Sequence, residues 1–573
     1  MVARSASWSL PARPFAAGES ARFAVLVAAA LLAFALAWLA LQHGFYRREQ
    51  IRDTEVYQRY GDSIVDGRIP YRDFRPEYPP AALPAFAVPS LAAGTGATED
   101  TYRRWFEAGM VVCGAFLLLF VALTLRSLGR EPPVLAAALL FVALAPLLLG
   151  SVVLSRFDLL PAALVAGALA AVCAGRERLA SGAVGVAIAA KVYPAVLVPL
   201  FVARAWARGG RRGAVATTGV LAAVLAACFL PFVVLGPEGV WASVVRQVSR
   251  PLQLESVGAS ALLAAHHAFG LDVTVRSSHG SQNLVGTLPD VLAVAQSLAL
   301  AATLVGIWVA SARDPSDRER LVRFSAAAVC ALVALGKVAS PQFLIWLVPL
   351  VPLVRGRRGV AATGLLAGAL VLTQVWFPYR YWDLVFDLDV VASWAIFGRD
   401  LLLLALLGVL AWPAGALDDV RLGLERMGWR TRDGEPISRE PPYGAGVVVW
   451  RRGQEGPELL VLHRSHHGPD YAGDWAWGPA AGARFPGERL EDCARRELRE
   501  ETGLELEVAP TGCGRKDWPL FVAESPPDAA VTLSAEHDAY VWLPVEDAAT
   551  RCLPARVGDG LRAVARTLAP EAR

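Results

Sequence analysis

Gly482-Ala-Arg-Phe-Pro-Gly-Glu488 opens a stretch that continues, after seven further residues, as Arg496-Glu497-Leu498-Arg499-Glu500-Glu501-Thr502-Gly503-Leu504. A helix over the second part would place Glu497, Glu500 and Glu501 on one face, because they are spaced by three and four residues. Leu498 would point the opposite way, toward a sheet, and Gly503 is a natural C-terminal stop. Three carboxylates on one face repel each other, and a hard divalent cation such as Mg²⁺ relieves that repulsion while binding phosphate. The stretch therefore predicts a metal-dependent site for a phosphate compound.

The same stretch resembles the signature of the Nudix hydrolases, Gly-x5-Glu-x7-Arg-Glu-hydrophobic-x-Glu-Glu-x-Gly-hydrophobic. Every specified position is met, and these are Gly482, Glu488, Arg496, Glu497, Leu498, Glu500, Glu501, Gly503 and Leu504. The alternative is a solvated acidic helix held by pairs such as Arg496–Glu500, which does not explain the glycines at both ends. The resemblance implies an α/β/α sandwich with a Mg²⁺ or Mn²⁺ site and a nucleoside diphosphate linked to another group as substrate.

Roles for individual residues follow from this resemblance. The implied metal ligands are Glu497, Glu500 and Glu501, with Glu488 assisting. The implied catalytic residues are Glu501, Glu497 and Arg496, with Arg496 orienting a glutamate. Gly482 would let the loop turn under the helix, and Gly503 would end it. Glu536 or His537 could act as a base or an additional ligand, and Phe485 stands where an acid is frequent. His463, His466 and His467 are expected at the surface.

The order of secondary structure expected for the C-terminal part agrees with such a sandwich. Strands are expected over residues 445–450, 458–463, 505–508, 520–523 and from 537 to 544, with a final helix over 557–568. Glycine- and charge-rich segments separate these apolar runs, as expected for turns.

Composition divides the 573-residue chain into unlike parts. It is 55% hydrophobic, but the long apolar runs end near residue 417. We therefore expect an N-terminal tail at 1–21, a polytopic membrane domain at 22–417, a linker at 418–440 and a soluble domain at 441–573. A net charge of +3 is too small to indicate nucleic-acid binding. The seven cysteines have no metal-ligand spacing and no disulfide pattern.

The apolar runs predict about ten to twelve membrane segments. The first run, Phe23–Leu41, looks like a signal anchor, since it is long and no small-residue cleavage site follows. Two later runs are interrupted by Lys191-Val-Tyr-Pro194 and by Lys337-Val-Ala-Ser-Pro-Gln342. If each interrupted run goes out to its proline and returns, all the basic loops fall on one side, which the positive-inside rule makes cytosolic. The N-terminus and the soluble domain would share that side of the plasma membrane, and segments 44–103, 237–289 and 379–397 would face outward.

Several polar residues within or beside these runs form ordered motifs. They are Asp53, Gly67-x-x-Pro70-Tyr71, Tyr78-Pro79-Pro80, Arg156-x-Asp158, Lys191-x-x-Pro194, Gln253-x-Glu255-Ser256 and Lys337-x-x-Ser340-Pro341-Gln342. A buried lysine in a membrane costs about 2.5–3.5 kcal/mol, so such residues usually have a function. This set resembles the GT-C membrane glycosyltransferases, and most of all glycosyltransferase family 87, the polyprenol-phosphate-mannose-dependent mannosyltransferases.

This second resemblance implies transfer of a sugar from a polyprenyl-phosphate donor, a membrane lipid, to a glycan or glycolipid acceptor on the outer face. Asp53 would be the general base, although Glu55 or Asp62 could be the working acid instead. Lys191, Arg156 or Lys337 would hold the leaving phosphate. The implied substrate-binding residues are Arg156, Asp158, Lys191, Lys337, Gln342 and Tyr78. The alternative is structural: the lysines would pair with Asp158 or Glu255 only to hold helices together.

The sequence thus predicts a membrane glycosyltransferase joined to a cytosolic Nudix pyrophosphohydrolase. One alternative is a membrane protein whose Nudix domain senses a nucleotide or nucleotide sugar without hydrolysing it. The complete set of glutamates in the signature favours hydrolysis. A transporter would also contain buried charges, but no convincing internal repeat is present.

Overall fold

The computed structural model describes residues 17–47, 51–411, 429–431, 435–454, 456–465, 468–469 and 471–568. The chain divides into two compact units, Met1–Trp412 and Pro413–Arg573. Most of the expected N-terminal tail, most of the expected linker, and both His466 and His467 lie outside the described residues.

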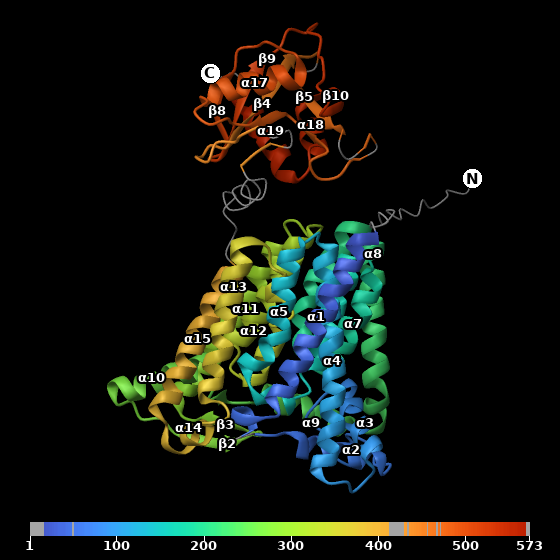
Figure 1. Ribbon diagram of the computed structural model, residues 1–573, viewed down its shortest axis with the longest axis vertical. Helices are drawn as coiled ribbons and strands as arrows, with labels where there is room; N and C mark the ends of the chain where they lie inside the picture. The colour runs from blue at the N-terminus through green and yellow to red at the C-terminus, as the bar shows by residue number, and fades with distance from the viewer. Residues whose placement is uncertain are drawn as a thin grey trace, which may run out of the picture. The chain divides into compact units, whose positions relative to one another are not determined.

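The N-terminal unit is built almost entirely of helices (Figure 1). They are α1 (Ala17–Leu41), α2 (Thr54–Val65), α3 (Leu83–Ala93), α4 (Glu99–Ser127), α5 (Pro132–Leu149), α6 (Leu159–Cys173), α7 (Glu177–Ala190), α8 (Val198–Leu235), α9 (Pro237–Val248), α10 (Val257–Phe269), α11 (Thr287–Ser311), α12 (Arg318–Leu335), α13 (Gly356–Trp376), α14 (Tyr381–Asp387) and α15 (Val390–Ala411). A small antiparallel sheet joins β1 (Leu252–Gln253), β3 (Ser281–Leu284) and β2 (Val275–Ser278) in that order.

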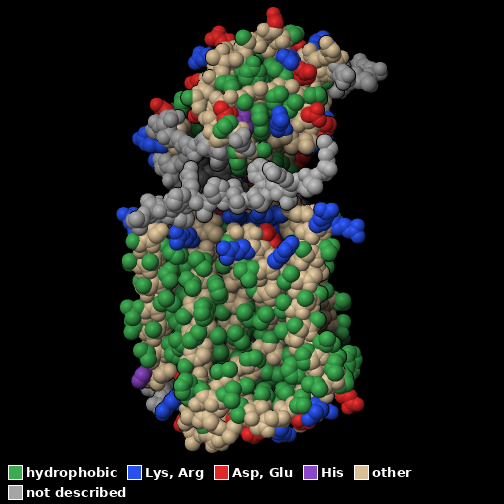
Figure 2. Space-filling view, turned by 90° about the vertical axis from the view of Figure 1, so that its right-hand side faces the viewer, with side chains coloured by type: hydrophobic (Ala, Val, Ile, Leu, Met, Phe, Trp, Pro, Cys, Tyr) green, Lys and Arg blue, Asp and Glu red, His purple; other side chains and the backbone are tan. Residues whose placement is uncertain are grey.

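Seven helical stretches of the described chain are long and apolar enough to cross a membrane. They are Ser20–Leu41, Glu99–Ser127, Pro132–Leu149, Tyr193–Leu235, Thr287–Ser311, Gly356–Trp376 and Val390–Ala411. Many large hydrophobic side chains on them are exposed, among them Leu32, Phe116 and Leu298. On the face that Figure 2 shows, hydrophobic side chains form a broad band across this unit, with arginine and lysine side chains gathered along one border. Exposed apolar surface of this extent is what a helical bundle presents to lipid.

The first interrupted run forms a re-entrant hairpin. Helix α7 ends at Lys191, a short 3₁₀ segment, Tyr193–Leu197, turns the chain, and the first part of α8 returns. An ion pair of 3.1 Å between Arg208 and Glu177 brings the end of the return beside the start of α7. Helix α8 then breaks at Gly210, whose φ of 56° is non-helical, and its second part runs outward again.

The second interrupted run also forms a re-entrant hairpin. The side chain of Arg130 binds both carboxylate oxygens of Glu319, at 2.5 and 2.6 Å, and the carbonyl oxygen of Leu353 at 2.9 Å. The start of α12 and the end of the segment that follows it therefore lie at the same end of the bundle. Both hairpins agree with the topology expected from the basic loops.

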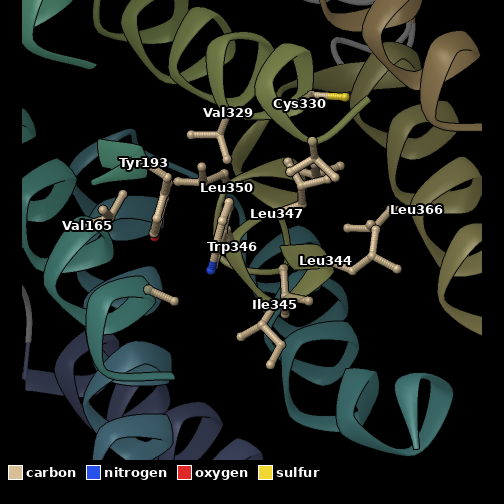
Figure 3. Close-up of a cluster of buried hydrophobic side chains, with 14 of the residues drawn as sticks. Val165, Tyr193, Val329, Cys330, Leu344, Ile345, Trp346, Leu347, Leu350 and Leu366 are labelled. Carbon is tan, nitrogen blue, oxygen red and sulfur yellow. The ribbon is translucent and has the colours of Figure 1, made fainter. Parts of the chain in front are cut away.

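Two aromatic rings join the turns of these hairpins. Tyr193, from the first turn, and Trp346, from the 3₁₀ segment Pro341–Trp346 of the second, stack with centroids 4.0 Å apart and planes 1° apart. Figure 3 shows this pair within a cluster of buried apolar side chains that includes Val165 and Leu347. The stack holds the two interrupted runs against each other inside the bundle.

The remaining loops meet at the opposite end of the bundle from Arg130. There α2, α3, α9, α14 and the small sheet lie close together (Figure 1). The Tyr379 hydroxyl donates to the carbonyl of Phe45 at 2.9 Å, and Arg246 pairs with Glu77 at 2.7 Å. The three segments expected on the outer side are therefore in mutual contact.

The C-terminal unit is a mixed sheet between helices. Its strands are β4 (Gly444–Arg452), β5 (Pro457–Arg464), β6 (Trp477–Gly478), β7 (Ala480–Ala483), β8 (Ala509–Arg515), β9 (Trp518–Glu524) and β10 (His537–Pro544). Their order is β10-β5-β4-β9-β8, with β4 and β9 parallel, β6 beside β5, and β7 beside β4.

Strand periodicity explains the two layers of this unit. Val447 and Val449 pack with Leu498 of α17 (Leu490–Thr502) on one face of the sheet. Val448 packs on the other face with Leu561 of α19 (Ala555–Leu568), beside α18 (Val545–Arg551). The unit is therefore the expected α/β/α sandwich.

One predicted strand, at residues 505–508, is wrong. The chain is irregular there and the strand begins at Ala509. Its Pro510, Gly512 and Gly514 disfavour a strand by sequence, but β8 is an edge strand with an irregular register against β9, where such residues are tolerated.

Candidate functional sites

Helix α17 carries the acidic residues of the C-terminal unit. The side chains of Glu497 and Glu501 are buried, 10% exposed for Glu497, whereas that of Glu500 is 51% exposed. Leu498 is fully buried against the sheet, and Gly503 ends the helix in the left-handed conformation with φ 69°. The amphipathic pattern expected from the sequence is therefore present, with Glu500 at the rim.

Arg496 links the acidic residues to each other. Its guanidinium binds both oxygens of Glu488, at 2.8 and 3.0 Å, as well as Glu497 at 2.7 Å and Glu500 at 3.2 Å. The ring of Phe485 lies 3.9 Å from the guanidinium carbon. Phe485 thus supplies a cation–π contact where an acid is frequent in the signature.

Glu488 contacts both Arg496 and the start of the loop. One of its oxygens also accepts the backbone N–H of Phe485 at 2.8 Å, so both oxygens are engaged in hydrogen bonds. The carboxylate therefore serves to hold Arg496 and the start of the loop, rather than lying free beside the acids of α17.

The resemblance suggested that Gly482 lets a loop turn under the helix, but Gly482 is not in a loop. It lies in strand β7, paired with Ala445 of β4. A Cβ atom at this position would lie 2.0 Å from the carboxylate of Glu497. The residue is glycine because the backbone of β7 and the acid of α17 meet there directly.

Burial and mutual repulsion raise the pKa of the buried acids. Burial raises the pKa of Glu497 to about 7, with Glu500 and Glu536 adding to the effect and Arg496 opposing it. Burial raises the pKa of Glu501 to about 8, against the backbone hydrogen bond from Ala481, and Glu497 and Glu536 raise it further. Glu536 therefore faces the same acidic cluster.

The donors present fit a hard divalent cation, although no three His, Cys, Asp or Glu side chains in the described parts of the chain form a ready-made cation site. The acidic side chains of this cluster are carboxylates, and carboxylate oxygens are donors that Mg²⁺ prefers. A bound cation would remove the repulsion that raises the pKa of Glu497 and Glu501. Because residue 482 has no Cβ, the backbone of β7 approaches the Glu497 carboxylate directly.

His463 was expected at the surface, and that prediction is wrong. Its side chain is 2% exposed, with Nδ1 at 2.5 Å from a carboxylate oxygen of Asp538 and Nε2 at 2.7 Å from the carbonyl oxygen of Tyr471. Burial lowers the pKa of His463, but these two acceptors outweigh it and raise the pKa overall. Through these two hydrogen bonds, His463 connects the loop after β5 to strand β10.

In the N-terminal unit, Asp53 lies beside Arg156. Asp53 occupies the N-cap position of α2 without a side-chain capping hydrogen bond, and one of its carboxylate oxygens forms an ion pair with the buried guanidinium of Arg156. The hydroxyl of Tyr57 lies 3.5 Å from the same oxygen. The structure therefore joins the expected base to one of the expected phosphate ligands.

A second ion pair lies next to the first. Lys191 binds Asp158 at 2.6 Å, and the indole N–H of Trp346 donates to the same oxygen at 2.6 Å. The ammonium of Lys191 also lies 4.9 Å from the ring of Phe157, which contacts the ring of Tyr78. The sequence Arg156-Phe-Asp158 thus connects both pairs, and Tyr78 packs against it.

Buried polar atoms without hydrogen-bond partners gather around this region. Among the described residues they include Asp158 Oδ2, Arg250 Nε, Gln253 Oε1 and Glu255 Oε2. Unsatisfied polar atoms are rare inside proteins and mark places where a ligand or water binds. Tyr381, from α14, interacts electrostatically with Glu255, Arg156 and Asp53, so it also faces the region.

The remaining expected residues of the membrane domain are Lys337, Gln342, Glu55 and Asp62. The carbonyl of Lys337 accepts the backbone N–H of Gln253 at 3.0 Å, and Gln342 is half-buried in the same 3₁₀ segment as Trp346. Glu55 is exposed, and Asp62 interacts with Tyr102 of α4. Of the three candidate acids, Asp53 is therefore the one paired with Arg156.

Comparison with known proteins identifies both units. A family model described as glycosyltransferase family 87 matches residues 77–341, and one described as NUDIX domain matches residues 440–566. The chain contains a glycosyltransferase family 87 domain in its N-terminal part and a Nudix domain in its C-terminal part. With its seven long apolar helices, this is the architecture of a multi-pass membrane enzyme. Nudix domains generally use a divalent metal such as Mg²⁺.

Individual relatives match one part of the chain. The bis(5'-nucleosyl)-tetraphosphatase of Mus musculus is 30% identical over 125 residues, 18% of this chain and 79% of its own length. An octanoyltransferase of Myxococcus xanthus is 35% identical over 133 residues, 21% of this chain, and the match spans only 36% of its own length.

Solved structures similar to this chain include a C. elegans Ap4A hydrolase binary complex, with 28% identity and a TM-score of 0.19, covering 22% of this chain and 96% of that one. Another is the MutT protein of Methanosarcina mazei Go1, with 30% identity and a TM-score of 0.19, covering 23% and 100%.

Several residues of the two domains were not singled out from the sequence. Asp538 and Tyr471 of the Nudix domain hold His463, and Trp346 and Tyr381 of the family 87 domain face its ion pairs. Each depends on contacts between segments far apart in the chain. The local signal for Trp346 in the sequence was its place in the apolar run that follows Pro341.

Proposed function

We propose that the Nudix domain hydrolyses a phosphoanhydride bond in a nucleoside diphosphate linked to another group. The supporting observation is the buried pair Glu497 and Glu501, placed on α17 against the glycine strand β7. Dinucleoside tetraphosphates are the first compounds to test, because a relative is named a bis(5'-nucleosyl)-tetraphosphatase.

The roles of the Nudix residues follow from their contacts. Glu497, Glu500 and Glu501 would hold Mg²⁺ or Mn²⁺, which when bound polarises phosphate and acidifies water. Arg496 fixes Glu497 through a bond of 2.7 Å, and Glu488 fixes Arg496. We assign Glu488 this positioning role in place of direct ligation.

Glu536 is the candidate proton acceptor. It precedes β10 and acts electrostatically on both Glu497 and Glu501, so it faces the same cluster from another element. From this position its carboxylate can take a proton from an attacking water.

For the membrane domain we propose transfer of a hexose, mannose by resemblance, from a polyprenyl-phosphate donor to a glycan or glycolipid. The supporting observation is the Asp53–Arg156 pair beside Lys191. A donor phosphate would compete with Asp53 for Arg156. Asp53, released from that pair, would take the proton of the acceptor hydroxyl as the glycosyl bond breaks.

The sidedness that we propose follows from charge. The arginine-rich end of the bundle would face the cytosol and the Asp53 end the outside. The start of α1 lies at the arginine-rich end, where Arg126 contacts Phe23 at 4.5 Å. The Nudix domain would then meet cytosolic nucleotides, and the transferase a donor that needs none.

One experiment tests each half in the full-length protein. Nucleoside diphosphate derivatives and dinucleoside polyphosphates would be screened with Mg²⁺, comparing wild type with Glu501→Gln. Loss of turnover with retained binding supports hydrolysis. No turnover by the wild type, with binding intact, would favour the alternative, a nucleotide sensor that regulates envelope synthesis.

The transferase half requires membranes and polyprenyl-phosphate-mannose. Asp53→Ala should abolish transfer, whereas Glu55→Ala, which changes an exposed acid, should leave it within about twofold. Equal transfer by wild type and Asp53→Ala would remove Asp53 from the reaction.

A further inference from the structure

The arginine-rich end of the membrane unit contains an open pocket of about 640 Å³. It lies between the start of α7 and the place where α8 breaks. The charged residues that line it are Arg176, Arg178, Arg208, Arg212 and Glu177. Four positive charges therefore face one negative charge, an excess of three.

The charges in this pocket are only partly neutralised. Glu177 pairs with Arg208 at 3.1 Å. Arg176, Arg178 and Arg212 are exposed, and no ion pair joins them to an acid within the described residues. Three arginines converging on a hollow, rather than scattered over a surface, are arranged to bind an anion.

The backbone conformation of α7 and α8 also contributes to the pocket. Gly210, with φ 56° and ψ −154°, breaks α8 and folds its two parts around the opening. Helix α7 begins at Glu177, with no side chain capping the N–H groups of its first turn. These groups add partial positive charge beside the arginines.

The helices that form the pocket also carry exposed apolar side chains. Leu179, which lines the pocket, is 59% exposed, and Trp206 and Val215, elsewhere on α8, are 57% and 63% exposed. These side chains are apolar and exposed on helices of the membrane unit. A ligand here can place an anionic group among the arginines and a hydrocarbon chain against exposed apolar side chains of these helices.

We propose that this pocket is a binding site for a phosphate anion, supplied by the headgroup of an anionic phospholipid. The same chemistry would accept the phosphates of a soluble polyphosphate, and the exposed apolar side chains of α7 and α8 favour the lipid. The site is separate from the Asp53 region, which lies at the opposite end of the bundle.

The test uses the purified full-length protein in a neutral detergent. Native mass spectrometry would count bound molecules of cardiolipin and of phosphatidylcholine over a concentration series, and sodium tripolyphosphate would be the soluble competitor. We expect cardiolipin to be retained in preference to phosphatidylcholine.

Two variants and a matched control separate the pocket from the basic border as a whole. Arg176→Gln/Arg178→Gln/Arg212→Gln should weaken cardiolipin binding at least about tenfold, because each arginine near a headgroup contributes several-fold. Ala216→Trp, which fills the lining without changing charge, should weaken it as well. The control Arg313→Gln/Arg355→Gln/Arg357→Gln removes the same charge from exposed positions of the basic loops and should stay within about twofold.

Each outcome decides the proposal. Equal losses in the pocket variant and the control, or unchanged binding in Ala216→Trp, would overturn it, because binding would then belong to the basic border in general. Full displacement of cardiolipin by tripolyphosphate at equal concentration would assign the pocket to a soluble anion instead. Unfolding temperatures of all variants would be compared to exclude loss of the fold.

Discussion

The backbone of Gly482 lies directly against the carboxylate of Glu497, so that an added Cβ would approach that group to 2.0 Å. This contact ties the first glycine of the signature to its buried acid. It also means that β7, α17 and the acidic cluster form one packed assembly, with no spare volume between strand and helix.

Replacing Gly482 should therefore disable the Nudix domain. Gly482→Ala would push the Glu497 carboxylate out of place and away from Arg496. We expect Mg²⁺-dependent hydrolysis to fall by at least about a hundredfold, since displacement of a catalytic group by about 1 Å has this effect. Steady-state kinetics would measure it.

Gly478→Ala is the matched control, because a Cβ there would meet nothing within 4 Å. Activity close to that of the wild type is expected. A fully active Gly482→Ala protein would contradict the assigned geometry.

The buried acids predict a pH dependence of stability without metal. The pKa values of Glu497 and Glu501 are raised to about 7 and about 8 from 4.5, so the folded domain keeps protons that the unfolded chain releases. The free energy of unfolding in EDTA should fall as pH rises from about 4.5 to about 8, and then level off. Calorimetry of the full-length protein would follow this transition.

The same protons oppose metal binding. The apparent affinity for Mg²⁺ should therefore increase with pH over that range. Glu497→Gln/Glu501→Gln should flatten both dependences, and an unchanged slope in this variant would assign the effect to other groups.

A double-mutant cycle distinguishes the two roles proposed for Lys191. Asp158→Asn leaves the lysine charge buried beside Phe157, which should cost about 3–5 kcal/mol of stability. Adding Lys191→Met to that variant should restore most of the loss, because the uncompensated charge is gone. Thermal unfolding would measure stability, and sugar transfer would be assayed in parallel.

If Lys191 only holds helices together, the double variant should recover transfer together with stability. If it binds the donor phosphate, transfer should remain lost in the stable double variant. We expect the second result.

The stacked rings between the two hairpins allow a finer comparison. Trp346→Phe keeps an aromatic ring in the stack but removes the N–H that donates to Asp158, and should cost about 1.5–3 kcal/mol. Tyr193→Phe removes a buried hydroxyl that has no hydrogen-bond partner among the described residues, so it should be neutral or slightly stabilising. Chemical denaturation of both variants would check the order, and equal losses would show that the indole bond contributes nothing.

Local patterns predicted a good part of this molecule. The spacing of the glutamates and Leu498 predicted α17 and its buried faces, because a helix turns every 3.6 residues whatever surrounds it. The lysine–proline breaks predicted both hairpins for a similar reason, since proline ends a helix locally.

Other features depend on partners distant in sequence. His463 looked like an edge residue, and only the approach of Asp538, 75 positions away, makes a buried site for it. The function of Gly482 depends on the placement of Glu497 against β7, and that of Phe485 on Arg496. Periodicity within one segment carries no information on contacts between segments that are distant in sequence.

The two re-entrant hairpins have a consequence for how such a chain can change over time. Each hairpin returns to the face from which it entered, so it adds helices without altering the parity of membrane crossings. A chain that gained or lost one would still deliver its C-terminal domain to the same compartment. The parity of crossings would then depend on the other helices alone, whatever chemistry the hairpin segments carry.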